Sequence, residues 1–373
     1  MAYSAITKPS LYFDTLLYTG NGATGSGQTL SGLGFQPDMT WVKSRTTTDG
    51  HTLQDVVRGF GETTKLSPYD NSQQNNSSGG SYGNYGYQSA ATSDGFTMVA
   101  GSNPGQNNKN TLTYAAWNWK AGDSNTSVTA SGSGNNCYNA CTHRANTTAG
   151  FSIITFTGRN DQISNGQQTR LTHGLGAKPD WVIIKCMTSN ENWVVQPGGE
   201  NDTHVNLNGT GAASGSYYTG NYNNNTSEYL VLGNSGWVNS GGETYVCYAF
   251  VEKQGFSKFG KYTGNGNADG TFVYTGFRPA FVLFKRWNGG TGNWQLLDSK
   301  RLGYNPDNKT FYPNTTTSEQ SENDIDFLSN GFKIRSSGTD GNGNGDVYIY
   351  AAFAAEPFVA NSGDDGVPAT AKA

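Results

Sequence analysis

The sequence predicts an all-β protein of three tandem antiparallel β-sandwich-like repeats, with extended N- and C-terminal arms. Three observations support this class. Short runs rich in Val, Ile, Thr, Tyr and Phe are separated by Gly, Asn and Asp turns, as in antiparallel sheets. Apolar residues seldom recur at the helical period of 3.6. The same ordered set of marks also occurs three times along the 373 residues.

The repeated marks follow one order in each copy. An aromatic-Thr-Gly loop opens the copy, a Gly-x-x-Pro step follows, and a lysine lies six residues after the proline. The glycine supplies a turn and the proline cannot donate a ladder hydrogen bond, so the step predicts the start of a strand. The prolines, which we expect at equivalent positions, and their lysines are Pro37 with Lys43, Pro179 with Lys185, and Pro279 with Lys285.

Strand periodicity is clearest near the end of the third copy. Lys333 and Arg335 alternate with apolar neighbours, as in a strand with one buried face. Residues 54–60 are the one segment for which we expect a short helix. The predicted divisions are an N-terminal arm 1–12, repeat 1 at 13–122 with a loop insertion 61–93, a polar linker 123–150, repeat 2 at 151–255, repeat 3 at 256–358, and a C-terminal arm 359–373.

Composition argues against two classes of partner. Charged residues make up 14% of the chain, and 24 basic against 28 acidic side chains give a net charge of −4. Nucleic acids and anionic membranes both attract basic patches, so we expect no nucleic-acid binding and no membrane insertion. No apolar run approaches the roughly 18 residues of a membrane span. The start of the chain lacks a signal-peptide pattern, so we expect assembly in a cytoplasm.

Several motifs with catalytic associations have simpler explanations. Residues 20–25 fit GxGxxG, but no helix follows, so we expect a hairpin turn. Residues 79–83 fit GxSxG inside a polar loop, where no nucleophile elbow can form. The four histidines lack zinc-ligand spacing, so we expect surface or hairpin positions. Asp324 and Asp326 share a strand face, yet exposed carboxylates at a strand start are usually solvated, and we assign no catalytic residue.

The cysteines are too few for a disulfide scaffold. Cys137 and Cys141 lie in a polar loop, whereas Cys186 and Cys247 lie in apolar runs, where a free buried thiol is the default interpretation. The sequence leaves open whether either pair forms a disulfide.

One acidic loop resembles a calcium loop, because oxygen ligands occur at alternate positions. No distal glutamate completes an EF-hand, and a wide hairpin loop explains the pattern equally well. We therefore expect no cofactor, with calcium as the one exception considered. The four candidate ligands are Asp340, Asn342, Asn344 and Asp346.

Aromatic side chains in polar loops carry the remaining functional signal. Sugar rings stack on exposed aromatic faces, and amide side chains bond sugar hydroxyls. Tyr and Trp are also enriched at protein interfaces, and the sequence does not separate the two uses. The candidates for glycan or interface contact are Tyr82, Tyr85, Tyr87, Tyr217, Tyr218, Tyr222, Trp287 and Trp294.

The repeat marks resemble a domain of unknown function found in virion structural and tail-fibre-like proteins of marine bacteriophages that infect cyanobacteria and Pelagibacter-type hosts. The middle repeat departs from this pattern, because it lacks Asp-x-Val-Arg-Gly and has Lys-Gln after Glu252 instead of Pro-Phe. The resemblance implies a virion component and no catalytic residues. The stretches that match are 18–22, 33–38, 41–43, 55–59 and 348–358, and residues 366–371 resemble the family's ending.

We therefore expect a non-enzymatic bacteriophage virion structural protein that is exposed on the particle. A tail- or fibre-type component that contacts host-surface glycan is preferred, and a capsid decoration protein is the alternative. A polysaccharide-degrading tailspike is least favoured, since few acids lie near the aromatic loops. We also expect a homo-oligomer, a trimer rather than a dimer, whose arms wrap around its symmetry axis. Other virion proteins are expected as further partners.

Overall fold

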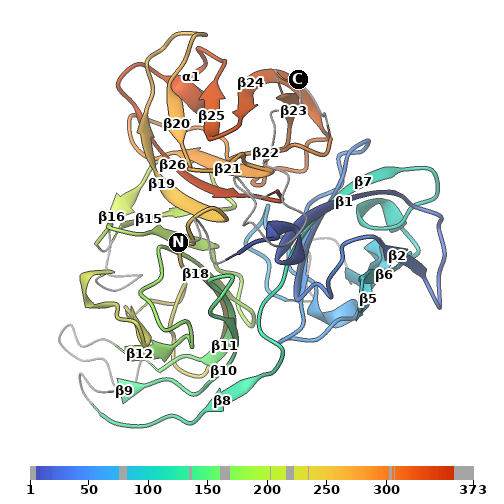
Figure 1. Cartoon of the computed structure of the whole chain (residues 1–373). Coiled ribbons are helices and arrows are strands. Elements are labelled where there is room, and N and C mark those ends of the chain that lie inside the picture. The colour runs from blue at the N-terminus through green and yellow to red at the C-terminus, as the bar shows by residue number, and fades with distance from the viewer. Residues whose placement is uncertain are drawn as a thin grey trace.

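Three lobes surround a common centre, and each lobe is formed by a separate stretch of the chain (Figure 1). In this computed structural model the lobes follow one another along the chain, which is coloured from blue at the N-terminus through green to red at the C-terminus. Nearly all regular structure is β, which confirms the predicted fold class. The described residues are 6–74, 82–133, 137–159, 169–201, 203–215, 222–233, 235–301, 305 and 307–356.

The helices in these ranges are single turns. The α-helix is α1 (Thr339–Asn342), and the 3-10 turns are Pro9–Leu11, Glu62–Thr64, Tyr82–Tyr85, Pro104–Gln106 and Tyr222–Asn224.

The first sandwich combines a four-stranded and a three-stranded sheet, both antiparallel. Its inner sheet, in spatial order, is β1 (Phe13–Thr19), β7 (Thr113–Trp119), β3 (Met39–Ser44) and β4 (Thr52–Asp55). Its outer sheet is β2 (Gln28–Ser31), β6 (Gly95–Val99) and β5 (Tyr87–Thr92).

The second sandwich has a longer inner sheet. Its order is β16 (Ser214–Gly215), β15 (Thr203–Asn206), β14 (Val194–Pro197), β13 (Trp181–Cys186), β18 (Thr244–Phe250), β11 (Phe151–Thr157), β10 (Cys141–Asn146) and β8 (Thr126–Val128). The outer sheet is β17 (Tyr229–Leu232), β12 (Thr169–Thr172) and β9 (Cys137–Tyr138), with β9 parallel to β12.

The third sandwich consists of two four-stranded sheets. The inner sheet is β19 (Ser257–Thr263), β26 (Val347–Phe353), β21 (Phe281–Arg286) and β22 (Gln295–Asp298). The outer sheet is β20 (Phe272–Tyr274), β25 (Gly331–Ile334), β24 (Gln320–Leu328) and β23 (Asp307–Thr310).

One strand order recurs in all three inner sheets. The opening strand pairs with the closing strand, the closing strand pairs with the strand after Gly-x-x-Pro, and that strand forms a hairpin with the next. The prolines Pro37, Pro179 and Pro279 each precede the third of these strands by two residues. The three inner sheets therefore share one strand connectivity.

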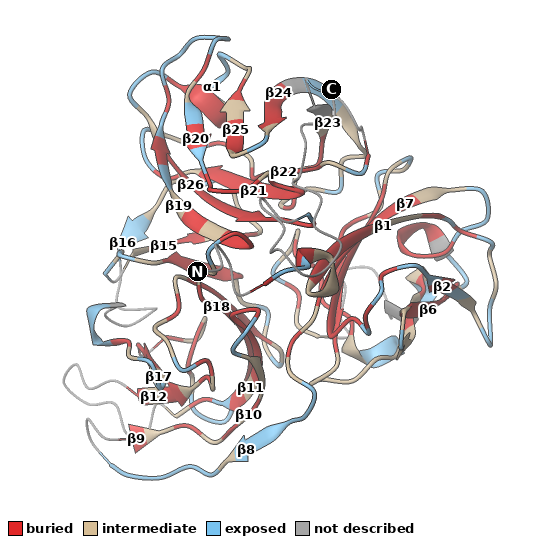
Figure 2. Ribbon diagram, in the orientation of Figure 1, coloured by how far each residue is buried: buried red, intermediate tan, exposed pale blue. Residues whose placement is uncertain are grey.

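The largest apolar cluster is shared by all three sandwiches, whereas three smaller clusters each lie between the two sheets of one sandwich. The shared core joins the inner sheets through aromatic contacts. The ring centroids of Phe13 and Phe281 are 5.5 Å apart, and those of Phe250 and Phe353 are 5.7 Å apart. The inner sheets are therefore buried on both faces, as the concentration of red in Figure 2 shows.

The aromatic-Thr-Gly marks are explained by a close backbone contact. A Cβ atom on Gly20, Gly158 or Gly264 would lie 2.3, 2.1 or 2.4 Å from a backbone carbonyl oxygen. Each of these carbonyls follows a buried asparagine whose side-chain amide donates to a backbone carbonyl, and these asparagines are Asn108, Asn239 and Asn342. Residues 20–25 connect the inner to the outer sheet, so the expected hairpin turn is wrong, although no nucleotide-binding helix follows.

The lysines after the three prolines are fully buried. The ammonium of Lys185 donates to the carbonyl of Asn71 in the first sandwich at 3.2 Å, and that of Lys285 donates to Thr210 in the second at 3.1 Å. Burial lowers the pKa of Lys43 to about 7 and those of Lys185 and Lys285 to about 8. Lys185 and Lys285 thus join neighbouring sandwiches.

The structure differs from the expected boundaries in four places. Residues 54–60 form the end of β4 and a turn instead of a helix. The insertion 61–93 contains β5, and the linker 123–150 contributes β8, β9 and β10 to the second sandwich. Part of the N-terminal arm is packed, because Ile6 is buried in the shared core. Residues 1–5 and 357–373 lie outside the described ranges.

Candidate functional site

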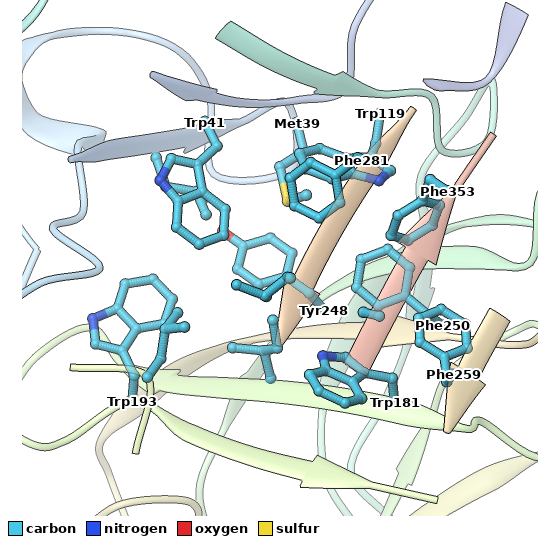
Figure 3. Close-up of a pocket in the computed structure, with 15 residues that line it drawn as sticks. Met39, Trp41, Trp119, Trp181, Trp193, Tyr248, Phe250, Phe259, Phe281 and Phe353 are labelled. Atoms are coloured by element: carbon cyan, nitrogen blue, oxygen red, sulfur yellow. The ribbon is translucent and has the colours of Figure 1, made fainter. Parts of the chain in front are cut away.

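The centre of the molecule holds a cavity of about 30 Å³ where the three inner sheets meet. Figure 3 shows Trp41, Trp181, Tyr248 and Phe281 turned toward it from different sandwiches. The space is on the scale of one or two water molecules, but water needs polar partners that this apolar lining does not offer. It is a packing gap between the three inner sheets rather than a ligand site.

Polar contacts between sandwiches involve Asp55 of the Asp-x-Val-Arg-Gly segment and, in the third sandwich, Asp298 of an Asp-x-x-Arg segment. Asp55 accepts a hydrogen bond from the hydroxyl of Tyr248 at 2.7 Å, and Asp298 accepts one from Nε1 of Trp117 at 2.9 Å. Each aspartate also pairs with the arginine three residues later, at 2.5 and 2.6 Å. The second sandwich has Pro197 at the corresponding register position. The Asp–Arg pair, which Asp-x-Val-Arg-Gly supplies in the first sandwich and Asp298 with Arg301 supplies in the third, is thus a buried structural contact.

The structure contradicts the surface positions expected for the two tryptophan candidates. Trp294 is fully buried, and its Nε1 donates to the carbonyl of Asn206 in the second sandwich at 2.8 Å. Trp287 is 7% exposed, and the ammonium of Lys261 lies 4.7 Å from its ring centroid. Both indoles fill the boundary between sandwiches and offer no face to a glycan.

The tyrosine candidates Tyr85 and Tyr87 of the first sandwich are half-buried. The ammonium of Lys65 lies 5.5 Å from the ring centroid of Tyr85, and Tyr87 belongs to the edge strand β5. Tyr217 and Tyr218 lie outside the described residues, as do the side chains of Tyr82 and Tyr222. The role of these tyrosines stays a prediction.

The four calcium candidates differ in burial and in their interaction partners. The side-chain amide of Asn342 is fully buried and donates to Asn265, and Asp346 pairs with Arg286 at 2.5 Å. Asn344 is exposed. Asp340 belongs to α1 and lines an open cleft. No group of three His, Cys, Asp or Glu side chains within the described ranges could hold a metal ion.

The histidines and cysteines are all in the interior. All four histidines are buried, so the expected surface positions are wrong. In one case, Nδ1 of His51 accepts a hydrogen bond from Trp41 at 3.0 Å. The four cysteines, each of them a described residue, are buried and free. Across the described part of the chain, no helix has the length and apolar character needed to cross a membrane.

The outer sheet of the third sandwich exposes an aromatic pair. Phe272 and Tyr274 are 45% and 57% exposed, and they are the exposed large hydrophobic side chains of the described ranges. They lie on one face of the edge strand β20, because they flank the buried Val273. The Cε2 atom of Phe272 lies 3.0 Å from where a Cβ on Gly331 would be, so this glycine leaves room for the ring.

The corresponding strands of the other two sandwiches lack aromatic side chains on this face. Strand β2 presents Thr29 and Ser31 beside the buried Leu30, and β12 presents Arg170 and Thr172 beside the buried Leu171. The fold therefore forms without aromatic rings here. Comparing the three copies along the sequence would have revealed this difference, whereas the sequence prediction considered aromatic residues only in loops.

Charged side chains border the aromatic pair. Lys333, which is opposite Phe272 in the register, pairs with Asp269 at 2.5 Å. Arg335 pairs with Asp269 at 3.3 Å and with Asp326 at 2.7 Å. These residues present hydrogen-bond donors and acceptors beside the aromatic pair.

Arg335 also lines an open cleft of about 640 Å³ in the third sandwich. The cleft lies among the start of β22, strand β24, the segment after β25 and α1. Glu322, Asp324 and Asp340 contribute three carboxylates to it, and Gln295 contributes an amide. Asp324 and Asp326 were expected to be exposed and solvated at a strand start, whereas they lie within β24 and are only 5% and 8% exposed.

Burial raises the pKa of Asp324 to about 6. The hydroxyl of Thr310 donates to this carboxyl group and lowers the pKa, whereas the nearby charges of Glu322 and Asp340 raise it. Asp326, two residues along the strand, has Arg335 as its partner. The two aspartates of the strand therefore have different environments, and of the two it is Asp324 that lines the cleft.

A family model described as a domain of unknown function (DUF7483) matches residues 8–357. The matched range includes all three sandwiches, the aromatic pair and the cleft. No curated protein and no solved structure matched the chain. The chain thus belongs to the DUF7483 family, whose description assigns no activity.

Proposed function

We propose that this protein is a non-enzymatic bacteriophage virion structural protein, exposed on the particle as a tail- or fibre-type component. In this proposal, the outer face of the third sandwich contacts saccharide on the host surface. The observation that carries the contact is the exposed pair Phe272 and Tyr274, at positions where the corresponding strands have polar side chains.

The chemistry of this face suits a sugar. Aromatic rings stack on the apolar faces of sugar rings, while Lys333, Asp269 and Arg335 offer hydrogen bonds to hydroxyl groups. Strand β20 is an edge strand, so an extended glycan can approach it from the side. The low charge of the whole chain favours a neutral ligand over a strongly charged one.

We also propose a homo-oligomer in the virion, with a trimer preferred, that contacts other virion proteins. One chain already places three sandwiches, each with its own outer sheet, around a shared core. Capsid decoration is the alternative location, and immuno-electron microscopy of the intact particle would distinguish a tail from a head position.

The test compares two double variants in binding to host cells or to their extracted surface polysaccharide. Each stacked ring contributes about 1 kcal/mol, so Phe272→Ser with Tyr274→Ser should weaken binding per site about thirtyfold. The matched control is Thr29→Ala with Ser31→Ala at the corresponding exposed positions of β2, which should leave binding unchanged. Melting temperature would verify that both variants fold.

Two outcomes would contradict the proposal. Equal binding by wild type and the Phe272/Tyr274 variant would exclude this face as the contact. Shortening of the polysaccharide by the purified wild-type protein would show a depolymerase of the tailspike type instead.

A further inference from the structure

Beyond the aromatic face, the cleft of the third sandwich contains a buried acceptor without a partner. Gln295 is 3% exposed, it lines the cleft, and its Oε1 has no hydrogen-bond partner among the described residues. A buried polar atom without a hydrogen bond carries an uncompensated desolvation cost, so native proteins seldom leave one unpaired. A ligand that donates a hydrogen bond to Oε1 would satisfy this acceptor.

The other sandwiches show that the fold does not require this glutamine. The register places Thr52 of β4 and Val194 of β14 at the same position as Gln295 of β22. The hydroxyl of Thr52 donates to Asn107 at 2.7 Å, and Val194 is apolar. The third sandwich thus differs from both by placing an unpaired amide oxygen at this position, beside an open cleft.

The remaining walls of the cleft are also rich in acceptors. Glu322, Asp324 and Asp340 bring three carboxylates. Arg335, the cation among the described lining residues, already pairs with aspartates outside the carboxylate set. The cleft therefore has an excess of negative charge above the pKa of Asp324. Its ligand must bring hydrogen-bond donors and positive charge.

The size of the cleft distinguishes between two kinds of cation. The described carboxylates do not converge closely enough to hold a metal ion. A space of about 640 Å³ is on the scale of small-molecule sites. Ser336, Ser337 and Thr339 line the cleft as well, so hydroxyl groups of a ligand would find partners beside the carboxylates.

We propose that this cleft binds a saccharide residue that carries a free, protonated amino group. The ammonium bonds the carboxylates of Asp340 and Glu322 and the amide oxygen of Gln295, while the ring hydroxyls bond the serine and threonine side chains. This inference goes beyond the proposed function and does not depend on it, because the aromatic pair is not part of the cleft.

The test measures binding of three sugars to the intact chain by calorimetry or ligand-observed NMR. Glucosamine should bind, whereas glucose and N-acetylglucosamine, which lack the ammonium, should bind at least tenfold more weakly. Glu322→Gln and Gln295→Leu should each weaken glucosamine binding about tenfold. Glu322 is exposed, so its variant should fold normally.

Two controls separate this site from other effects. Asp123→Asn removes a carboxylate that is 93% exposed and distant in sequence, and it should leave glucosamine binding unchanged. Phe272→Ser with Tyr274→Ser should also retain glucosamine binding, even if it abolishes attachment to host cells. Absence of glucosamine binding by the wild type, or equal binding of glucose and glucosamine, would overturn the inference. Unchanged glucosamine binding by both cleft variants would overturn it as well.

Discussion

Replacing Asp298 with alanine should lower the free energy of unfolding by about 5 kcal/mol, because it breaks a buried contact between two sandwiches. Asp298 and Arg301 have fully buried side chains. Asp298 accepts hydrogen bonds from Nε of Arg301 at 2.6 Å and from Nε1 of Trp117 at 2.9 Å. Without the carboxylate, the guanidinium keeps Glu319 at 3.3 Å and the carbonyl of Leu296 at 3.2 Å.

The magnitude follows from two contributions. Removing one partner of a buried ion pair costs about 3–5 kcal/mol, and leaving a buried indole N–H unpaired costs about 1–3 kcal/mol more. Asp298→Asn retains one oxygen that can accept from Trp117, but it loses the charge and one acceptor, because the backbone N–H groups of Lys300 and Arg301 donate to the other oxygen. It should cost roughly 3 kcal/mol. The double variant Asp298→Ala with Arg301→Met should be more stable than the sum of the single effects predicts.

Urea denaturation followed by far-UV circular dichroism measures these differences, provided that the slope of the transition is unchanged. Asp123→Ala, at an exposed ion pair, is the matched control and should leave the midpoint unchanged. A loss below about 1 kcal/mol for Asp298→Ala would refute the reasoning, since it would mean that the carboxylate is not buried between sandwiches.

Two further predictions concern the repeated marks. Gly264→Ala should destabilise the protein by about 1–3 kcal/mol in the same denaturation assay, because its Cβ would lie 2.4 Å from the carbonyl oxygen of Gly343. Gly211→Ala, where no atom lies within 4 Å of the added Cβ, is the control and should be neutral. Burial lowers the pKa of Lys43 to about 7, so the unfolded chain binds more protons above that pH. Stability should therefore rise from pH 7 to pH 9.5, and Lys43→Met should reduce this rise; a flat wild-type profile would contradict the burial of the lysines.

Much of the fold could be predicted from local pattern. Alternation and turn residues predict the strands, and the repeated glycines mark positions where two backbones come into close contact, as at Gly20 and Gly158. These signals are local, because a strand's own sequence records which of its faces are buried.

The shared core was not predicted, because a sequence pattern does not say what covers a buried face. One signal was present: the strands β13 and β21 each begin with four consecutive apolar residues, and these residues are all buried. That pattern indicates a third layer beyond a simple sandwich. Missing it left Trp294 as a surface candidate, although the residue packs between two sandwiches.

The two proposed contact surfaces were predicted least well. The cleft joins Gln295, Asp324 and Asp340 from separate elements, and their proximity depends on how the two sheets of one sandwich meet. Phe272 and Tyr274 were overlooked, since alternation predicts only that one face of β20 is exposed. Comparison of the three copies with one another is the signal that would have singled them out.

Differential scanning calorimetry of the intact chain tests the central claim most directly, namely that three sandwiches share one core. We expect a single transition whose calorimetric and van't Hoff enthalpies agree, because the inner sheets cannot lose one neighbour without exposing the shared cluster. Separate transitions, together with a protease-resistant fragment corresponding to one sandwich, would contradict it.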